Sequence, residues 1–210
     1  MQLKIIECPR DAMQGWKNRI PAKKKIEYIN QLLKVGFDTI DFGSFVSHEA
    51  IPQMADTKEV AEQLDVKNSN SKLLAIIANL RGAIEAVEFD KIYYLGFPFS
   101  VSPTFQMRNT HSSIGDSLNT VKEIKNICDK NNRELVIYIS MAFGNPYDDQ
   151  YNEDLVLTWI EELVGLGIRI ISLSDTVGLA HPPQISSLVK KVVSAFADIE
   201  TGVHLHSTHA

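Results

Sequence analysis

Two histidines separated by one residue stand near the end of the sequence, at His204 and His206. In a β-strand, residues i and i+2 point to the same side, so both imidazoles would face one way and Leu205 the other. Their Cα atoms would lie about 7 Å apart, near enough for both rings to converge on one metal ion. The alternative is a pair of polar residues at a strand end, each hydrogen-bonded to its neighbours.

A second group that could do chemistry follows the first apolar run, where Pro9 precedes Arg10 and Asp11. Asp11 would add a carboxylate to the two imidazoles, and such mixed ligation suits Mg²⁺ or Mn²⁺, or a hydrolytic Zn²⁺. Arg10 would stabilise an oxyanion that develops beside the metal. The alternative for Arg10 is a surface ion pair with Asp11, worth under about 1 kcal/mol. Cys8 is expected to be a small buried hydrophobe rather than a nucleophile.

Short apolar runs alternate with amphipathic stretches along the sequence, which predicts strands alternating with helices. Strands are expected at 3–6, 37–42, 72–77, 91–95, 135–139, 168–173 and 203–206, and helices at 21–36, 57–64, 81–87, 113–127, 152–166 and 182–196. This alternation implies parallel strands joined by right-handed crossovers. Seven strands in 210 residues give about 30 residues per unit, the spacing of a (β/α)8 TIM barrel. A doubly wound open sheet is the alternative, but no GxGxxG motif follows the first strand.

The expected architecture is therefore α/β, with residues 1–210 forming a single TIM-barrel domain. The sequence reaches only the seventh strand, so the eighth strand and the C-terminal part of the barrel are expected to be missing from it. In a barrel, chemistry collects at the carboxyl ends of the strands. Asp41 and Ser44 lie at that end of the second strand, and Asp175 and Thr176 follow the sixth. These four residues join the candidates.

The charge balance argues against nucleic acid as a partner. The chain has 21 basic and 26 acidic residues and a net charge of −5. Its one lysine run, at 23–25, stands among Glu and polar residues and is expected to be a solvated helix face rather than a basic stripe. No apolar run approaches the ~18 residues of a membrane helix, so no membrane association is expected. Cys8 and Cys128 are the only cysteines and form neither a zinc motif nor a disulfide framework. These features favour a cytoplasmic protein.

Seven segments of the chain match, in order, the motifs of one enzyme family. They are Pro9–Gln14, Asp41, Ser44–Ser47, Ile51–Met54, Gly144–Tyr147, Ser172–Gly178 and Val203–His206. In these segments the chain resembles the 3-hydroxy-3-methylglutaryl-CoA lyases, which belong to the superfamily of metal-dependent lyase and Claisen-synthase barrels. The resemblance runs through nearly the whole chain, and seven matches in register are more specific than any one of them.

The resemblance implies a retro-Claisen cleavage of 3-hydroxy-3-methylglutaryl-CoA to acetoacetate and acetyl-CoA, assisted by Mg²⁺ or Mn²⁺. Asp11, His204 and His206 would be the metal ligands. Arg10 would neutralise the enolate oxygen of the thioester, and Asp41 would support the site in place of a glutamate. The residues that would take part in catalysis are Arg10, Asp11, Asp41 and Asp175. Those that would bind the acyl-CoA substrate are Arg10, Gln14, Ser44 and Thr176.

The chain departs from the family pattern at several positions. Cys8 stands in place of a glycine, Ala12 and Met13 in place of Gly-Leu, His48 in place of a common proline and Ser207 in place of an aspartate. The family's catalytic cysteine and an asparagine ligand follow strand seven and lie outside this sequence.

Two alternatives stay open for the function. One is a condensing enzyme of the same superfamily, which joins acetyl-CoA to a 2-keto acid as isopropylmalate and citramalate synthases do, although the Arg10–Gln14 segment is nearer to the lyases. The other is a barrel that binds an acyl-CoA or a partner protein without turnover. Barrels of this type often dimerise, so we keep a homodimer as a candidate assembly.

Overall fold

The computed structural model describes residues 3–206 of the chain, which divides into two compact units. The first unit comprises Met1–Gly96 and Ile127–Glu134, and the second Phe97–Asn126 and Leu135–Ala210. Strand β4 (Ile92–Ser100) and helix α6 (Ile114–Lys130) contribute residues to both. Within the described residues, no helix combines the length and the apolar character needed to cross a membrane.

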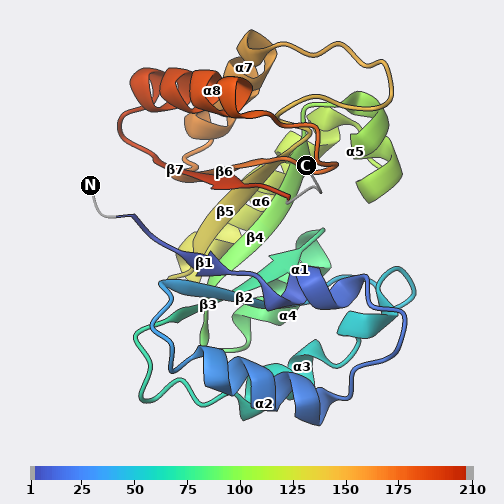
Figure 1. The fold of residues 1–210 in the computed structure, drawn as a ribbon, viewed down its shortest axis with the longest axis vertical. Coiled ribbons are helices and arrows are strands. Elements are labelled where there is room, and N and C mark those ends of the chain that lie inside the picture. The colour runs from blue at the N-terminus through green and yellow to red at the C-terminus, as the bar shows by residue number, and fades with distance from the viewer. Residues whose placement is uncertain (1–2, 207–210) are drawn as a thin grey trace. The chain divides into compact units, whose positions relative to one another are not determined.

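The first unit is built on parallel strands that neighbour one another in sequence order, from β1 to β4 (Figure 1). The strands before β4 are β1 (Ile6–Glu7), β2 (Thr39–Phe45) and β3 (Lys72–Ile77). The helices are α1 (Pro9–Gln14), α2 (Ala22–Leu32), α3 (Thr57–Gln63) and α4 (Leu80–Val87), with a 3₁₀ turn, η1, at Pro52–Met54. β2 is buried along its whole length, so it forms the centre of this core.

The second unit, which begins within β4, repeats the pattern. Its strands are β5 (Glu134–Ser140), β6 (Ile170–Ser174) and β7 (Glu200–His204), and its helices are α5 (Pro103–Thr110), α6, α7 (Glu153–Gly165) and α8 (Pro182–Ala195). β6 pairs in parallel with β5 on one side and β7 on the other. Consecutive strand order is typical of a TIM barrel, whereas a doubly wound sheet places its first strand in the interior. The predicted α/β barrel fold is confirmed, and the alternative of a doubly wound open sheet is wrong.

Side-chain caps explain why several helices begin where they do. Asn152 Oδ1 accepts a hydrogen bond from the N–H of Leu155 at the start of α7. Ser113 Oγ accepts from the Asp116 N–H and donates to the Asp116 carboxylate at the start of α6. In both cases a polar side chain satisfies an N–H group that the first helical turn leaves without a partner.

Some element boundaries differ from the sequence-based expectation. The run after the first strand forms helix α1, because proline is tolerated in the first turn of a helix. The strand expected at 3–6 is short, since Leu3 lies outside the sheet and is 86% exposed. β7 ends at His204, so His206 lies beyond the strand instead of on it. Helix α5 was not expected, and β4 continues to Ser100.

Gly82 allows α4 to pack directly on the end of β2. A Cβ at Gly82 would lie 2.4 Å from the carbonyl oxygen of Phe45, a backbone atom that cannot rotate away. Gly82→Ala is therefore expected to destabilise the chain by about 1–3 kcal/mol, the usual cost of overpacking. The measurement is the urea midpoint of unfolding.

Gly165 in α7 provides the matched control, because nothing lies within 4 Å of a Cβ built there. Gly165→Ala is expected to stabilise the helix by up to about 1 kcal/mol. Equal urea midpoints for the two variants would contradict the close packing of α4 on β2.

Candidate functional site

Arg10 is the centre of a buried polar cluster in the first unit. Its Nε lies 3.2 and 3.1 Å from the two carboxylate oxygens of Asp41, and its Nη2 donates to Asp41 Oδ2 at 2.6 Å. Arg10 is 8% exposed and Asp41 is fully buried. The ion pair with Asp11 that was the alternative does form, at 2.9 Å, but Arg10 itself is buried, so it is not a surface pair.

The same guanidinium also holds Asp11 and Gln14. Arg10 Nη1 donates to Asp11 Oδ1 at 2.9 Å and to Gln14 Oε1 at 3.0 Å, and Gln14 Nε2 lies 3.4 Å from the same Asp11 oxygen. Helix α1 explains the arrangement, because residues three and four apart on a helix are neighbours. The Asp11 carboxylate is thus held in one orientation just after β1, where a metal ligand was expected.

A bulge in β2 brings Asp41 and Ser44 to the same face of the sheet. The register pairs Asp41 with Leu74 and Ser44 with Ile76, and it shifts by one residue between Asp41 and Gly43. Leu74 and Ile76 are two residues apart on β3 and share a face, so their partners on β2 do too. Without the bulge, residues three apart would point to opposite faces.

Ser44 itself is buried, at 2% exposure. Its backbone N–H donates to Thr57 Oγ1 at 3.2 Å. Its own hydroxyl oxygen, shielded from solvent, has no hydrogen-bond partner among residues 3–206. Ser44 therefore has hydrogen-bonding capacity that the described protein atoms do not use.

In the second unit, the two histidines lie close together at the end of β7. Their ring centroids are 5.3 Å apart. His206 Nδ1 lies 2.6 Å from the backbone carbonyl oxygen of Asp175, which follows the neighbouring strand β6. A carbonyl can only accept, so in this contact Nδ1 carries the hydrogen and Nε2 presents the lone pair. Metal-binding histidines commonly use this arrangement, in which the second nitrogen donates to a backbone carbonyl.

Asp175 and Thr176 organise the loop that follows β6. The N–H of Asp175 donates to the His204 carbonyl at 2.9 Å, and Asp175 Oδ1 accepts from two N–H groups of its own loop, at 2.8 and 3.1 Å. Thr176 Oγ1 accepts from the N–H of Met141 at 2.9 Å. Asp175 is only 3% exposed, and the two N–H groups that donate to its carboxylate fix the orientation of that carboxylate.

Gln53 was not a sequence-based candidate, although its side chain organises the loop after α1. Gln53 Oε1 accepts from the N–H of Ile20 at 2.9 Å. Its Nε2 donates to the carbonyls of Trp16 and Asn18 at 3.2 and 2.9 Å. A glutamine in a single 3₁₀ turn gives no periodic signal, so only its place in the Ile51–Met54 motif could have drawn attention to it.

A buried ion pair fixes Gln53 in turn. Lys25 of α2 is 2% exposed, and its Nζ donates to the Gln53 carbonyl oxygen and, at 2.6 Å, to Asp56 Oδ1. Lys25 belongs to the lysine run expected to be a solvated helix face, and at this position that expectation is wrong. Its burial ties α2 to the segment that positions the loop after α1.

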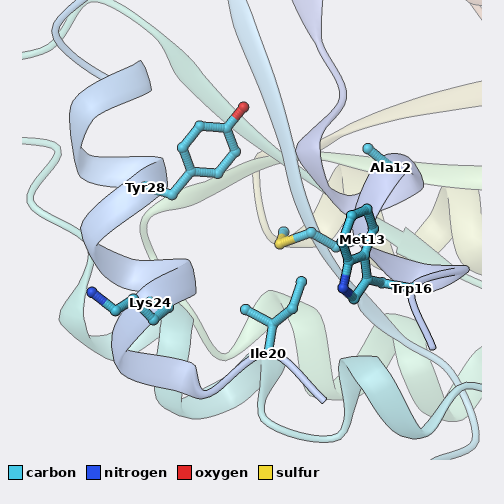
Figure 2. A pocket seen from close by; sticks show the side chains of 6 residues that line it. All are labelled: Ala12, Met13, Trp16, Ile20, Lys24 and Tyr28. Atoms are coloured by element: carbon cyan, nitrogen blue, oxygen red, sulfur yellow. The ribbon is translucent and has the colours of Figure 1, made fainter. Parts of the chain in front are cut away.

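An open pocket of about 360 Å³ lies between this loop and α2 (Figure 2). It is lined by Ala12, Met13, Trp16, Ile20, Lys24 and Tyr28. Figure 2 shows the Met13 sulfur pointing into the space between α1 and α2. The charged lining residue, Lys24, forms an exposed ion pair with Glu27 at 2.9 Å. The pocket therefore offers apolar contact and no acid–base pair.

A family model described as HMGL-like matches residues 2–210. The chain is 32% identical over 200 residues to the hydroxymethylglutaryl-CoA lyase YngG of Bacillus subtilis, covering 95% of this chain and 66% of that protein. It is 31% identical over 208 residues to the cytoplasmic 3-hydroxy-3-methylglutaryl-CoA lyase of Homo sapiens, covering 99% of this chain and 56% of the relative. The chain thus spans less than two thirds of the length of these curated relatives.

The chain is also similar to solved structures of HMG-CoA lyases. An HMG-CoA lyase from Acinetobacter baumannii, in complex with coenzyme A and 3-methylmalate, is similar with a TM-score of 0.91 at 32% identity. That match covers 99% of this chain and 68% of the other. The HMG-CoA lyase of Bacillus subtilis is similar with a TM-score of 0.92 at 31% identity, covering 98% and 69%.

Gln53→Ala is expected to loosen the loop after α1, because it removes three hydrogen bonds worth about 1 kcal/mol each. Lys17 and Arg19 are exposed in this loop and are sites for trypsin. Cleavage at these two sites is expected to be at least about tenfold faster than in the unmodified chain. Mass spectrometry of timed digests measures it.

The control is Gln63→Ala, at an exposed glutamine that ends α3. Its cleavage at Lys17 and Arg19 should match that of the unmodified chain. If Gln53→Ala were cut no faster than the control, the loop would not depend on the Gln53 amide.

Burial, and next the nearby negative charge of Asp41, raise the pKa of the Cys8 thiol to about 12, from 9.0. Cys8 is therefore protonated at neutral pH and is not an activated nucleophile. Alkylation of native Cys8 by iodoacetamide is expected to stay slow to about pH 10, whereas the urea-unfolded chain reacts with a midpoint near pH 9. Peptide mass spectrometry separates Cys8 from Cys128.

The raised pKa of Cys8 also makes the stability of the fold depend on pH. The unfolded thiol loses its proton first, so the contribution of the protonated thiol to folding is present below about pH 9 and is lost as the pH rises towards 12. A native alkylation midpoint near pH 9 would contradict the partial burial of Cys8 as the cause of a raised pKa.

Proposed function

The chain belongs to the HMGL-like family, and from that premise we propose that it cleaves 3-hydroxy-3-methylglutaryl-CoA into acetoacetate and acetyl-CoA. The observation that carries the proposal is the buried Arg10 guanidinium, held by Asp41 and bonded to Asp11 and Gln14 just after β1. The relatives reported above are lyases of this kind, which favours a lyase over a condensing enzyme and over a barrel without turnover.

We propose Asp11, His204 and His206 as ligands of one divalent cation, Mg²⁺ or Mn²⁺. The donor set fits such an ion, because imidazole nitrogen and carboxylate oxygen together suit Mn²⁺ and tolerate Mg²⁺. The hydrogen bond from His206 Nδ1 to the Asp175 carbonyl supports the assignment, since it leaves Nε2 as the ligand atom. When bound, the ion would supply Lewis-acid chemistry that lowers the pKa of the tertiary hydroxyl of the substrate.

Arg10 would act on the other half of the substrate. Loss of the hydroxyl proton breaks the carbon–carbon bond, and the electron pair passes to the thioester as an enolate, which is then protonated to acetyl-CoA. A permanently charged guanidinium stabilises the enolate oxygen. The Asp41 carboxylate keeps that guanidinium in place by accepting hydrogen bonds from Arg10 Nε and Nη2. Little reorganisation of the guanidinium would therefore be needed during the reaction.

The remaining candidates would shape the site for the acyl-CoA. Ser44 offers a hydroxyl with unused hydrogen-bonding capacity, on the same face of β2 as Asp41. Gln14 orients Asp11, and Asp175 with Thr176 holds the loop that follows β6. In one relative, coenzyme A is bound together with 3-methylmalate, which supports an acyl-CoA as the substrate class.

Location and domain organisation stay predictions. Some relatives carry the word cytoplasmic in their names and others the word mitochondrial. On the composition of the chain, we propose the cytoplasm, and we propose one barrel domain.

The test is release of acetyl-CoA from 3-hydroxy-3-methylglutaryl-CoA by the full-length protein, with Mn²⁺ or Mg²⁺ and after removal of metal with EDTA. Release is expected only with metal. Arg10→Met is expected to lower kcat by about 10²–10³-fold, the cost of losing an oxyanion stabiliser. His206→Ala is expected to abolish metal-dependent release, because a ligand is lost.

Two matched variants serve as controls. Arg19→Met removes an exposed arginine of the loop after α1, and His111→Asn changes an exposed histidine whose φ of 54° asparagine tolerates. Both should retain the unmodified rate. Metal-independent release, or full activity in Arg10→Met, would disprove the mechanism, and condensation of acetyl-CoA with a 2-keto acid would replace the lyase with the synthase.

A further inference from the structure

Ser174, the last residue of β6, carries a buried hydroxyl that no group in residues 3–206 satisfies. Ser174 is 7% exposed, and its Oγ is shielded from solvent without a hydrogen-bond partner in that range. Buried hydroxyls in native proteins are mostly hydrogen-bonded, and an unpaired one is unfavourable, so the Ser174 hydroxyl calls for a partner.

The register of β6 and β7 identifies the neighbour of this hydroxyl. Ser174 pairs with His204, and Ser172 pairs with Gly202. Paired residues of adjacent parallel strands project from the same face, and the strands lie about 4.8 Å apart. The Ser174 hydroxyl and the His204 imidazole are therefore neighbours on one face. The fully buried Leu173, between the two serines, belongs to the other face.

The surroundings of His204 restrict its ring. The ring of Tyr138 lies 6.2 Å from it, centroid to centroid, in an edge-to-face arrangement. The ring of His206 lies 5.3 Å from that of His204, centroid to centroid, and is also nearly perpendicular to it. Because the two residues are paired in the register, rotation of either side chain between staggered rotamers changes the distance between the hydroxyl and the ring nitrogens.

The neighbouring histidine, His206, already has an acceptor for one of its ring nitrogens. Its Nδ1 is anchored to the Asp175 carbonyl, the backbone group directly after Ser174. An acceptor on the second nitrogen fixes the tautomer and the ring plane and makes the first nitrogen a better ligand. A serine hydroxyl can accept such a hydrogen bond as well as a carbonyl can.

We propose that Ser174 is a positioning residue for His204, and that its Oγ accepts the N–H of the His204 ring nitrogen that does not bind the metal. The inference rests on the proposed function, because it takes His204 as a ligand. It gives each histidine its own acceptor at the end of β6: the Asp175 carbonyl for His206 and the Ser174 hydroxyl for His204.

The experiment measures Mn²⁺ binding to the metal-stripped full-length protein by isothermal titration calorimetry, with no substrate present. Ser174→Ala is expected to weaken Mn²⁺ binding about 10–100-fold, the usual effect of losing a hydrogen bond to a ligand. Ser174→Thr retains the hydroxyl and should bind Mn²⁺ within about threefold of the unmodified protein. Ser172→Ala, at a serine two residues earlier on the same face, is the matched control and should bind normally.

Urea unfolding of the metal-free variants separates positioning from a merely structural role. Ser174→Ala removes an unpaired hydroxyl and should leave the metal-free urea midpoint unchanged or raise it, while Mn²⁺ binding falls. A lowered metal-free midpoint would indicate a structural role and would overturn the inference.

Two further outcomes distinguish this inference from the proposed function. Normal Mn²⁺ binding by Ser174→Ala, with binding by the unmodified protein intact, overturns the role of Ser174 and leaves the metal site standing. Absence of Mn²⁺ binding by the unmodified protein overturns the proposed metal site and this inference with it.

Discussion

The buried ion pair between Arg10 and Asp41 is the interaction on which the candidate site of the first unit depends. Removing two charges from water is costly, and the cost is offset only when the partners are close and well hydrogen-bonded. Here the guanidinium meets the carboxylate through two of its nitrogens, with Asp41 fully buried. Because the pair is fixed, the remaining nitrogen of Arg10 can hold Asp11 and Gln14.

The surroundings of that pair are held in place by other buried polar contacts. Lys25 fixes the segment that carries Gln53, and Gln53 fixes the backbone of the loop after α1. Each of these interactions satisfies a charge or an amide inside the protein, so the loss of one is expected to weaken the next. The role proposed for Arg10 would need this rigidity, because preorganised charge stabilises a developing oxyanion best.

In the second unit, the candidate residues are held by backbone groups at the ends of two strands rather than by a buried ion pair. The hydrogen-bond ladder of β6 and β7 continues past the strands, as the Asp175 N–H bonds to the His204 carbonyl and the Asp175 carbonyl receives His206 Nδ1. The orientation of the His206 imidazole therefore follows from the backbone at the end of β6. Such backbone anchors are insensitive to side-chain identity, which explains why sequence reading could place the histidines but not their partners.

Much of the fold, and the choice of residues for the candidate site, followed from the sequence, because apolar periodicity and strand-end polarity are local signals. The strand at 72–77 was predicted to the residue, and the helix at 57–64 to within one residue. Helix α1 and the burial of Lys25 were not predicted, since a six-residue helix is too short for a periodic pattern and a lysine reads as exposed. What only the tertiary structure decided is the pairing of residues distant in sequence. Asp41 and Ser44 share a face because a bulge shifts the register of β2, and Arg10 meets Asp41 across 31 residues of chain. A register is set by contacts between strands, and no single segment contains that information.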